Sequence, residues 1–205
     1  MSKLKAMQQA QKDKFDNLNT PINCIEPLRD LLVHKLNLLR PGIAIWECCD
    51  VGNSYITKYF LEQKFKVHSS DIRAPLPKTN RFNKYTFQWD FLGDMLRVNR
   101  DKFIITNPPY SLKDKFIARA VEYMNGGGLN GFAFLLPISC LEGINRHSSY
   151  KKANDLNFSI CFASYDKRVN FTQNKSNYFG CGWLIVYKQQ ESVYRNYLEF
   201  LHYKT

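Results

Sequence analysis

Short segments rich in apolar residues alternate along the chain with longer segments in which apolar residues recur three and four positions apart. The short segments predict buried strands over residues 43–46, 66–70, 85–89, 103–106, 131–136, 158–165 and 181–187. The longer segments predict helices, most clearly over residues 54–63 and 112–125. Strands this apolar, alternating with helices, indicate a parallel sheet covered on both faces. We therefore predict an α/β fold with a doubly wound, mostly parallel seven-stranded sheet in three α/β/α layers.

The two ends of the chain carry different patterns. Residues 1–19 are rich in Lys, Gln and Asp, which predicts a basic and polar arm before a single domain over residues 20–205. Apolar residues at helical spacing then predict a helix with Thr20 as its N-cap and Pro21 as its first residue, ending at Pro41-Gly42. The aromatic segment 194–203 predicts a final helix that caps the sheet.

A polar side chain closes each of the first four predicted strands. These residues are Glu47, Asp71, Asp90 and Asn107. In doubly wound sheets, ligands bind beyond the carboxyl ends of the strands. One acid at such a position commonly caps the following helix, but four polar residues in succession predict a ligand site.

Two of these acids suit a nucleoside. Asp71 follows the first strand-to-helix loop by about twenty residues, the spacing at which an acid accepts hydrogen bonds from both hydroxyls of a ribose. Asp90 offers an acceptor for an exocyclic amine, and its neighbour Phe91 offers an apolar face for a purine. Phe91 alone is equally well explained as a core residue.

The fourth strand runs directly into Asn107-Pro108-Pro109-Tyr110. Two consecutive prolines fix the backbone φ angles and remove two N–H donors. The Asn side chain and the nearby carbonyls are therefore available to a ligand, and we predict a rigid ligand-facing loop.

Together these motifs resemble the S-adenosylmethionine-dependent amino-methyltransferases, especially the small, phage-type N6-adenine DNA methyltransferases. The resemblance extends from Thr20 to about Tyr187 and implies the Rossmann-like class I methyltransferase version of the predicted fold. It implies that Asn107, Pro108, Pro109 and Tyr110 form the catalytic loop. It also implies that S-adenosyl-L-methionine is held by Thr20, Pro21, Glu47, Cys48, Gly52, Asp71, Ile72, Asp90 and Phe91.

The same resemblance suggests how an adenine amino group is methylated. The side-chain oxygen of Asn107 and the carbonyl of Pro108 would accept its two N–H groups and localise the nitrogen lone pair. Tyr110 would stack on the base after it leaves the duplex. Phe171, in a segment similar to the closing hairpin of the family, is a second candidate for stacking, or an ordinary core residue.

The first loop departs from the family pattern. The family has Glu-Pro-x-x-Gly-x-Gly, whereas residues 47–53 here place Val51 and Asn53 where the glycines are expected and keep only Gly52. Glycine serves there because the backbone approaches the cofactor closely or adopts positive φ. The departure keeps a second hypothesis open: a pseudo-methyltransferase that binds nucleic acid or supports a partner subunit.

Charge favours a polyanionic partner. The chain has 29 Lys and Arg against 18 Asp and Glu, a formal net charge of +11. This argues against a protein amide as substrate and fits DNA or RNA, of which the resemblance favours DNA. Candidate phosphate contacts are Lys78, Arg81, Lys84, Arg146, Lys151, Lys152, Lys167 and Arg168.

The six cysteines have neither the paired spacing of a zinc site nor the density of a disulfide scaffold, so we expect reduced thiols and no metal. No apolar stretch approaches the length of a membrane span, and the first residues lack the apolar core of a signal peptide. We expect a cytoplasmic protein without membrane contact, with a protein partner or a homodimer as open alternatives.

Overall fold

The structure, a computed structural model, describes residues 19–73, 86–93, 102–171, 180–188 and 196–203. These residues form one eight-stranded sheet in the order β3-β2-β1-β4-β5-β7-β6-β8. Its strands are β1 (Ala44–Glu47), β2 (Val67–Asp71), β3 (Thr86–Gln88), β4 (Lys102–Thr106), β5 (Gly131–Pro137), β6 (Phe158–Tyr165), β7 (Cys181–Lys188) and β8 (Asn196–Leu201). Neighbouring strands pair in parallel except at β7, which is antiparallel to both β5 and β6.

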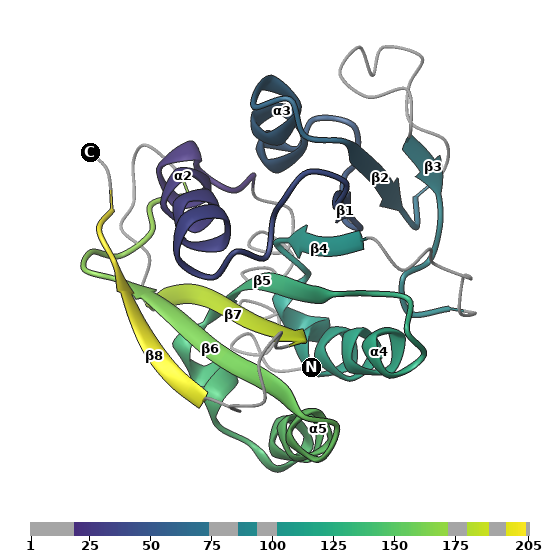
Figure 1. Cartoon of the computed structure of the whole chain (residues 1–205), viewed down its shortest axis with the longest axis vertical. Coiled ribbons are helices and arrows are strands. Elements are labelled where there is room, and N and C mark those ends of the chain that lie inside the picture. Colours follow the sequence, from purple (N-terminus) through teal and green to yellow (C-terminus); the bar gives the residue numbers. More distant parts are fainter. Residues whose placement is uncertain (1–18, 74–85, 94–101, 172–179, 189–195, 204–205) are drawn as a thin grey trace, which may run out of the picture.

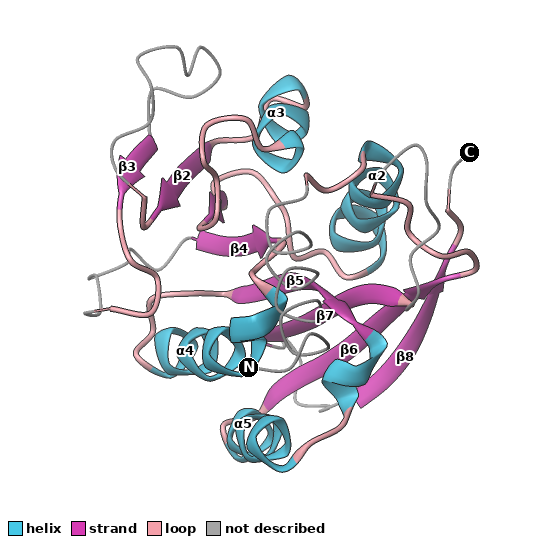
Figure 2. Ribbon diagram, turned by 180° about the vertical axis from the view of Figure 1, so that it is seen from behind, coloured by secondary structure: helices cyan, strands magenta, loops and turns pink. Residues whose placement is uncertain are grey.

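Helices cover both faces of the sheet, as Figures 1 and 2 show from opposite sides. They are α2 (Ile22–Asp30), α3 (Tyr55–Glu62), α4 (Lys113–Asn125) and α5 (Ile144–Asp155). Side chains of α2 and α3 belong to the hydrophobic core on one face, and those of α4 and α5 to the core on the other. The predicted three-layer, doubly wound fold is confirmed, with one strand more than expected.

The strand order places the switch point between β1 and β4. The chain runs outward from β1 through β2 to β3, then returns to the other side of β1 with β4. The carboxyl ends of β1, β2 and β4 therefore lie side by side at one edge of the sheet, where ligands bind in such folds.

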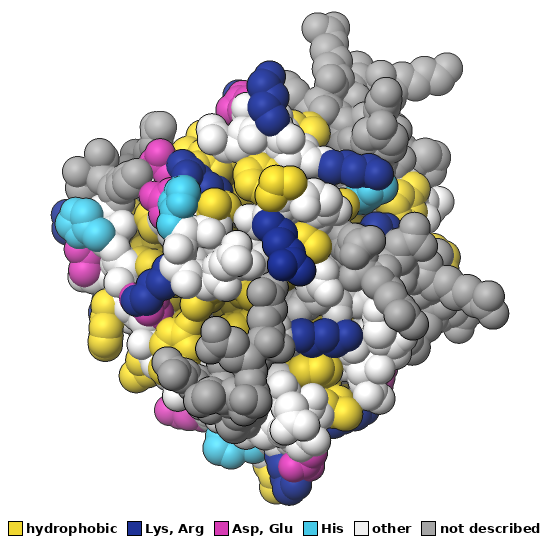
Figure 3. Space-filling view, viewed as in Figure 1, with side chains coloured by type: hydrophobic (Ala, Val, Ile, Leu, Met, Phe, Trp, Pro, Cys, Tyr) yellow, Lys and Arg dark blue, Asp and Glu magenta, His cyan; other side chains and the backbone are white. Residues whose placement is uncertain are grey.

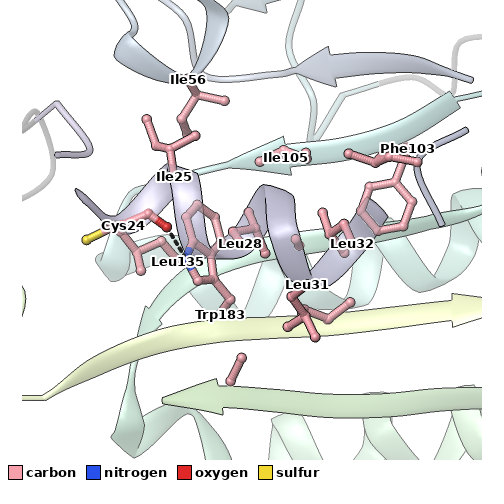
Figure 4. Close-up of a cluster of buried hydrophobic side chains, with 14 of the residues drawn as sticks. Cys24, Ile25, Leu28, Leu31, Leu32, Ile56, Phe103, Ile105, Leu135 and Trp183 are labelled. Carbon is pink, nitrogen blue, oxygen red and sulfur yellow. Dashed lines mark hydrogen bonds between the residues drawn. The ribbon is translucent and has the colours of Figure 1, made fainter. Parts of the chain in front are cut away.

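The core on the α2 face is anchored by a polar contact as well as by apolar packing (Figure 4). The carbonyl oxygen of Cys24 accepts hydrogen bonds from Trp183 Nε1 at 3.3 Å and from the Tyr165 hydroxyl at 2.6 Å. Leu28 and Leu32 of the same helical segment are fully buried. These contacts hold α2 against β6 and β7 and so place the chain that precedes it.

The first helix differs from its prediction at both ends. Pro21 has an extended ψ of 142° and occupies the N-cap position itself, and Thr20 does not cap the helix. Because Pro21 keeps an extended backbone, the helix begins one residue later than predicted, at Ile22, and Thr20 lies outside the cap position. The sequence reasoning also overlooked Pro27 inside the helix. The regular helix ends at Asp30, and a π-helical turn over Leu31–Lys35 follows.

The predicted C-terminal helix is wrong, because β8 forms there and pairs in parallel with β6. Its side chains alternate: Tyr197 and Glu199 are partly buried, whereas Leu198 and Phe200 are exposed. Lys35 Nζ pairs with the Glu199 carboxylate at 2.7 Å. Aromatic residues in such an alternation favour a strand.

Two further features of the structure concern its cysteines and the length of its helices. All six cysteines are free thiols, five of them buried. Within the described ranges, no helix is long and apolar enough to cross a membrane.

We predict that Leu28→Ala lowers the free energy of unfolding by about 2–5 kcal/mol, because it opens a cavity under α2 that its neighbours cannot fill. Urea denaturation followed by circular dichroism measures the change. The control is Leu198→Ala on the exposed face of β8, for which we expect a change within about 0.5 kcal/mol. Equal losses in the two variants would contradict the assignment of the core.

Candidate functional site

A cavity of about 690 Å³ opens at the carboxyl ends of β1, β2 and β4. This volume lies within the range of about 300–1,000 Å³ that is usual for small-molecule sites. Its walls include nine of the predicted site residues: Thr20, Glu47, Cys48, Asp71, Ile72, Asp90, Phe91, Asn107 and Pro109. Pro21, Gly52, Pro108, Tyr110 and Phe171 do not line it.

Glu47, the last residue of β1, is buried among hydrogen-bond donors from three segments. Its Oε1 accepts the backbone N–H of Cys49 at 3.0 Å and the hydroxyl of Thr106 at the end of β4. Its Oε2 accepts the Ser54 hydroxyl at 3.3 Å. Burial raises the pKa of Glu47 to about 8 despite the Thr106 hydrogen bond, and the charge of Asp50 adds to the rise. The side chain is therefore mostly neutral at pH 7.

Asp50, which the sequence reasoning missed, organises the loop after β1. Its Oδ1 accepts the backbone N–H groups of Gly52 at 2.6 Å and Ser54 at 3.1 Å, and its Oδ2 accepts the Thr57 hydroxyl at 2.7 Å. An Asp two residues before a Gly is a usual signal for such a side-chain turn. The loop is thus held to the first turn of α3.

Val51 and Asn53, which stand where the family has glycines, change the backbone of this loop less than the sequence suggests. Gly52 has φ 103°, and neither Val51 nor Asn53 has a positive φ. The one position that needs left-handed geometry therefore still has glycine. Val51 and Asn53 both line the cavity, so their side chains, rather than their backbone, distinguish this loop from the family pattern.

Asp71, the last residue of β2, is in contact with a cation from its own loop. The backbone N–H and Nε of Arg73 donate to Oδ1 at 2.9 and 2.6 Å, and Arg73 Nη2 donates to Oδ2 at 2.9 Å. Both residues line the cavity. The sequence reasoning selected the acid and missed the arginine two positions later.

The residues after β3 are divided between the cavity and the core. Asp90 is exposed and accepts the backbone N–H of Leu92 at 2.9 Å. Phe91 is only 2% exposed and stacks on Phe116, with the ring centroids 4.9 Å apart. Most of the Phe91 ring therefore belongs to the core, as the alternative explanation of this residue expected.

Some buried polar atoms in the cavity wall have no hydrogen-bond partner among the described residues, including two on side chains that flank the site. These two are Thr20 Oγ1 and Trp89 Nε1. An unsatisfied buried donor or acceptor is costly. A ligand in the cavity is a natural source of such partners, and Trp89 was not selected from the sequence.

The Asn107–Tyr110 segment leaves the sheet at the end of β4. Asn107 is partly buried and lines the cavity together with Pro109, while Pro108 is buried. Tyr110 packs against both hydrophobic cores, and its hydroxyl lies 3.6 Å from Cys181 Sγ. The loop is therefore anchored on each side of the sheet.

Of the candidate nucleic-acid contacts that the structure describes, none lines the cavity. Arg146 pairs with Asp114 at 2.7 Å and joins α4 to α5, and Lys151 pairs with Asp155 on α5 at 2.6 Å. Lys152, Lys167 and Arg168 are exposed, and Phe171 packs partly against the core on the α2 face. Lys78, Arg81 and Lys84 lie outside the described residues. On the face in Figure 3, basic side chains are interspersed with apolar and uncharged ones.

Comparison with solved structures decides the fold. The chain superposes on a proposed class I S-adenosylmethionine-dependent methyltransferase from Listeria monocytogenes with a TM-score of 0.59, 15% identity and 89% of this chain covered. It has the class I methyltransferase fold. The methyltransferase subunit of a type I restriction-modification system from Streptococcus thermophilus gives a TM-score of 0.61, 13% identity and 89% coverage of this chain.

The class I fold is shared with a proposed RNA methyltransferase from Pyrococcus horikoshii, at a TM-score of 0.56, 13% identity and 94% coverage of this chain and 100% of that protein. This chain spans 65% of the Listeria protein and 47% of the Streptococcus subunit. No protein-family model and no curated protein matches it. Identities this low establish the fold and leave the reaction to be argued from the site.

Glu47 makes stability depend on pH in a specific direction. Its pKa rises from 4.5 to about 8 on folding, so between these values the unfolded chain binds fewer protons than the folded one. Stability is therefore lost as the pH rises through this window, at most by about 5 kcal/mol at about 1.4 kcal/mol per pH unit. We predict that Glu47→Gln flattens the fall of the melting temperature between pH 5 and 8.

The measurement is thermal unfolding at a series of pH values. Glu62→Gln, on the exposed surface of α3, is the matched control and should keep the slope of the unmodified protein. Parallel curves for Glu47→Gln and the unmodified protein would show that Glu47 titrates normally.

Proposed function

We propose that this chain is an S-adenosylmethionine-dependent methyltransferase that methylates the exocyclic N6 amino group of adenine in DNA. One observation carries the proposal: a single cavity at the switch point of a class I methyltransferase fold brings Asp71 and Glu47 together with Asn107 and Pro109.

The cavity fits the methyl donor in its chemistry. Asp71 suits a ribose diol, Asp90 an exocyclic amine and Ile72, which is exposed, an apolar ring face. The buried hydroxyl of Thr20 and indole N–H of Trp89 are available for polar groups of the ligand. When bound, the cofactor supplies an activated methyl group.

The residues of the catalytic loop have to make an aromatic amine nucleophilic. The nitrogen lone pair of such an amine is delocalised into the ring. Two acceptors that take hydrogen bonds from the N–H groups of the amine localise this lone pair on the nitrogen. Asn107 Oδ1 and the Pro108 carbonyl are the proposed acceptors, and the prolines hold them in place before the substrate arrives. Catalysis would then depend on positioning and preorganised dipoles.

Tyr110 and Phe171 are the proposed stacking residues for the extruded base. Stacking of a base on an aromatic ring is worth roughly 1–3 kcal/mol. The core contacts of Tyr110 hold its ring at the end of the loop, close to the catalytic Asn107 in sequence. A ring held in this way loses little conformational entropy when a base stacks on it.

DNA is the proposed substrate because of the net charge of +11 and the motif resemblance, and the fold likeness to a restriction-modification methyltransferase subunit supports it. The likeness to a proposed RNA methyltransferase keeps RNA as the alternative substrate. A pseudo-methyltransferase is the alternative of another class, and Val51 and Asn53 in the cavity wall are the residues that favour it.

We predict methyl transfer from labelled S-adenosylmethionine to a DNA pool, with N6-methyladenine as the product. Asn107→Ala should lower the transfer rate by about 10²-fold or more, because it removes an acceptor for the amine, and should leave cofactor affinity within about twofold. Nucleoside analysis and calorimetric titration with the cofactor measure the two effects.

Asn125→Ala, at the exposed end of α4, is the control and should behave as the unmodified protein. Label found in RNA or protein instead of DNA would reassign the substrate. A chain that binds no cofactor at high concentration is not an autonomous methyltransferase.

A further inference from the structure

The carboxylate of Asp71 is largely used by Arg73. Three donors of Arg73 reach it: the backbone N–H and Nε at Oδ1, and Nη2 at Oδ2. A carboxylate has about four lone-pair sites, two on each oxygen. Both sites of Oδ1 are therefore taken, and one site remains on Oδ2.

A ribose offers two hydroxyl donors to such an acid. With Arg73 in place, the remaining site on Asp71 can accept only one of them. If the arginine side chain leaves, the backbone N–H of Arg73 still holds Oδ1, and one site on Oδ1 and two on Oδ2 become available. The diol then finds an acceptor for each hydroxyl.

The two partners of this ion pair differ in exposure. The side chain of Asp71 is 6% exposed, whereas that of Arg73 is 55% exposed. A guanidinium that moves into water is hydrated at once, but the buried carboxylate needs replacement donors. A ligand that brings two hydroxyls supplies them.

We propose that Arg73 is an internal competitor for the nucleoside diol: its side chain occupies Asp71 in the ligand-free chain and is displaced when a ribose binds. The inference rests on the proposed function in assigning a nucleoside to this cavity. Cofactor affinity is then set in part by how readily Arg73 leaves, and this residue lowers the affinity that Asp71 alone would provide.

The competing role is distinguishable from a purely structural one. The loop after β2 is turned by the backbone N–H of Arg73, which any residue except proline supplies. The side chain adds the ion pair to Asp71, and replacing it keeps the backbone N–H that makes the turn. If Arg73 instead positioned Asp71 for the ligand, its removal would weaken binding.

The test is calorimetric titration of the purified full chain with adenosine and with 2′,3′-dideoxyadenosine, which lacks the diol. We expect Arg73→Met to bind adenosine about tenfold more tightly than the unmodified protein, because the charge-assisted bonds that compete with the diol are gone. The affinity for 2′,3′-dideoxyadenosine should not change. Arg73→Gln is a second variant and should shift in the same direction.

The matched control is Lys58→Met, which removes one positive charge and one surface ion pair, with Glu62, away from the cavity wall. It should leave both affinities within about twofold, and thermal melting checks that each variant is folded. Weaker or unchanged adenosine binding by folded Arg73→Met would overturn the proposal, as would an equal gain for both nucleosides or no binding of adenosine to any variant.

Titration with S-adenosylmethionine separates this inference from the proposed function. Tighter adenosine binding by Arg73→Met, together with no binding of S-adenosylmethionine by any variant, would support the competition and refute the methyl donor. Tight binding of S-adenosylmethionine, with an affinity that Arg73→Met leaves unchanged, would support the methyl donor and refute the competition.

Discussion

The site depends on the buried carboxyl group of Glu47. It joins the end of β1 to the loop through the Cys49 N–H, to the start of α3 through the Ser54 hydroxyl and to the end of β4 through the Thr106 hydroxyl. Thr106 is the residue before the Asn107–Tyr110 loop, for which we propose a catalytic role. One side chain therefore sets the distance between the proposed cofactor loop and the proposed catalytic loop, and burial keeps it mostly uncharged at neutral pH.

Three acids at this edge of the sheet, Glu47, Asp50 and Asp71, have different electrostatic surroundings. Glu47 is surrounded by neutral donors, Asp50 accepts two backbone N–H groups and a hydroxyl, and Asp71 is paired with a guanidinium. Buried carboxylates need such compensation. Since, of these three acids, only Asp71 is paired with a half-exposed side chain, it is the acid best suited to exchange its hydrogen bonds for those of a ligand.

The hydrophobic core supports the proposed catalytic loop from two sides. Tyr110 contacts the core under α2 as well as the core under α4, and Phe116 on α4 stacks on Phe91 at the cavity wall. Packing on both faces of the sheet thus converges near one loop. Dense packing of this kind adds to the restriction that the two prolines of the loop impose.

Sequence alone was sufficient for the α/β architecture and for the strands that precede the site, because burial on both faces imposes a local and readable apolar pattern. Glu47, Asp71 and Asn107 lie at the strand ends as predicted, whereas β3 ends at Gln88, two residues before Asp90. The helix predicted over residues 194–203 was wrong because the alternation of aromatic residues there, which favours a strand, was given too little weight, and the segment pairs with β6 as β8. The first helix keeps regular hydrogen bonding only as far as Asp30, where a π-helical turn begins, and the apolar spacing did not predict this change.

Only the tertiary structure decided how the site residues are used. The sequence identified Asp71, Phe91 and Arg146 as candidates, but a list of residues does not say what each one touches. The structure pairs Asp71 with Arg73, buries Phe91 against Phe116 and uses Arg146 to join two helices. Residue type determines what a side chain can bind, whereas its burial and its partners, which depend on distant segments, determine what it does bind.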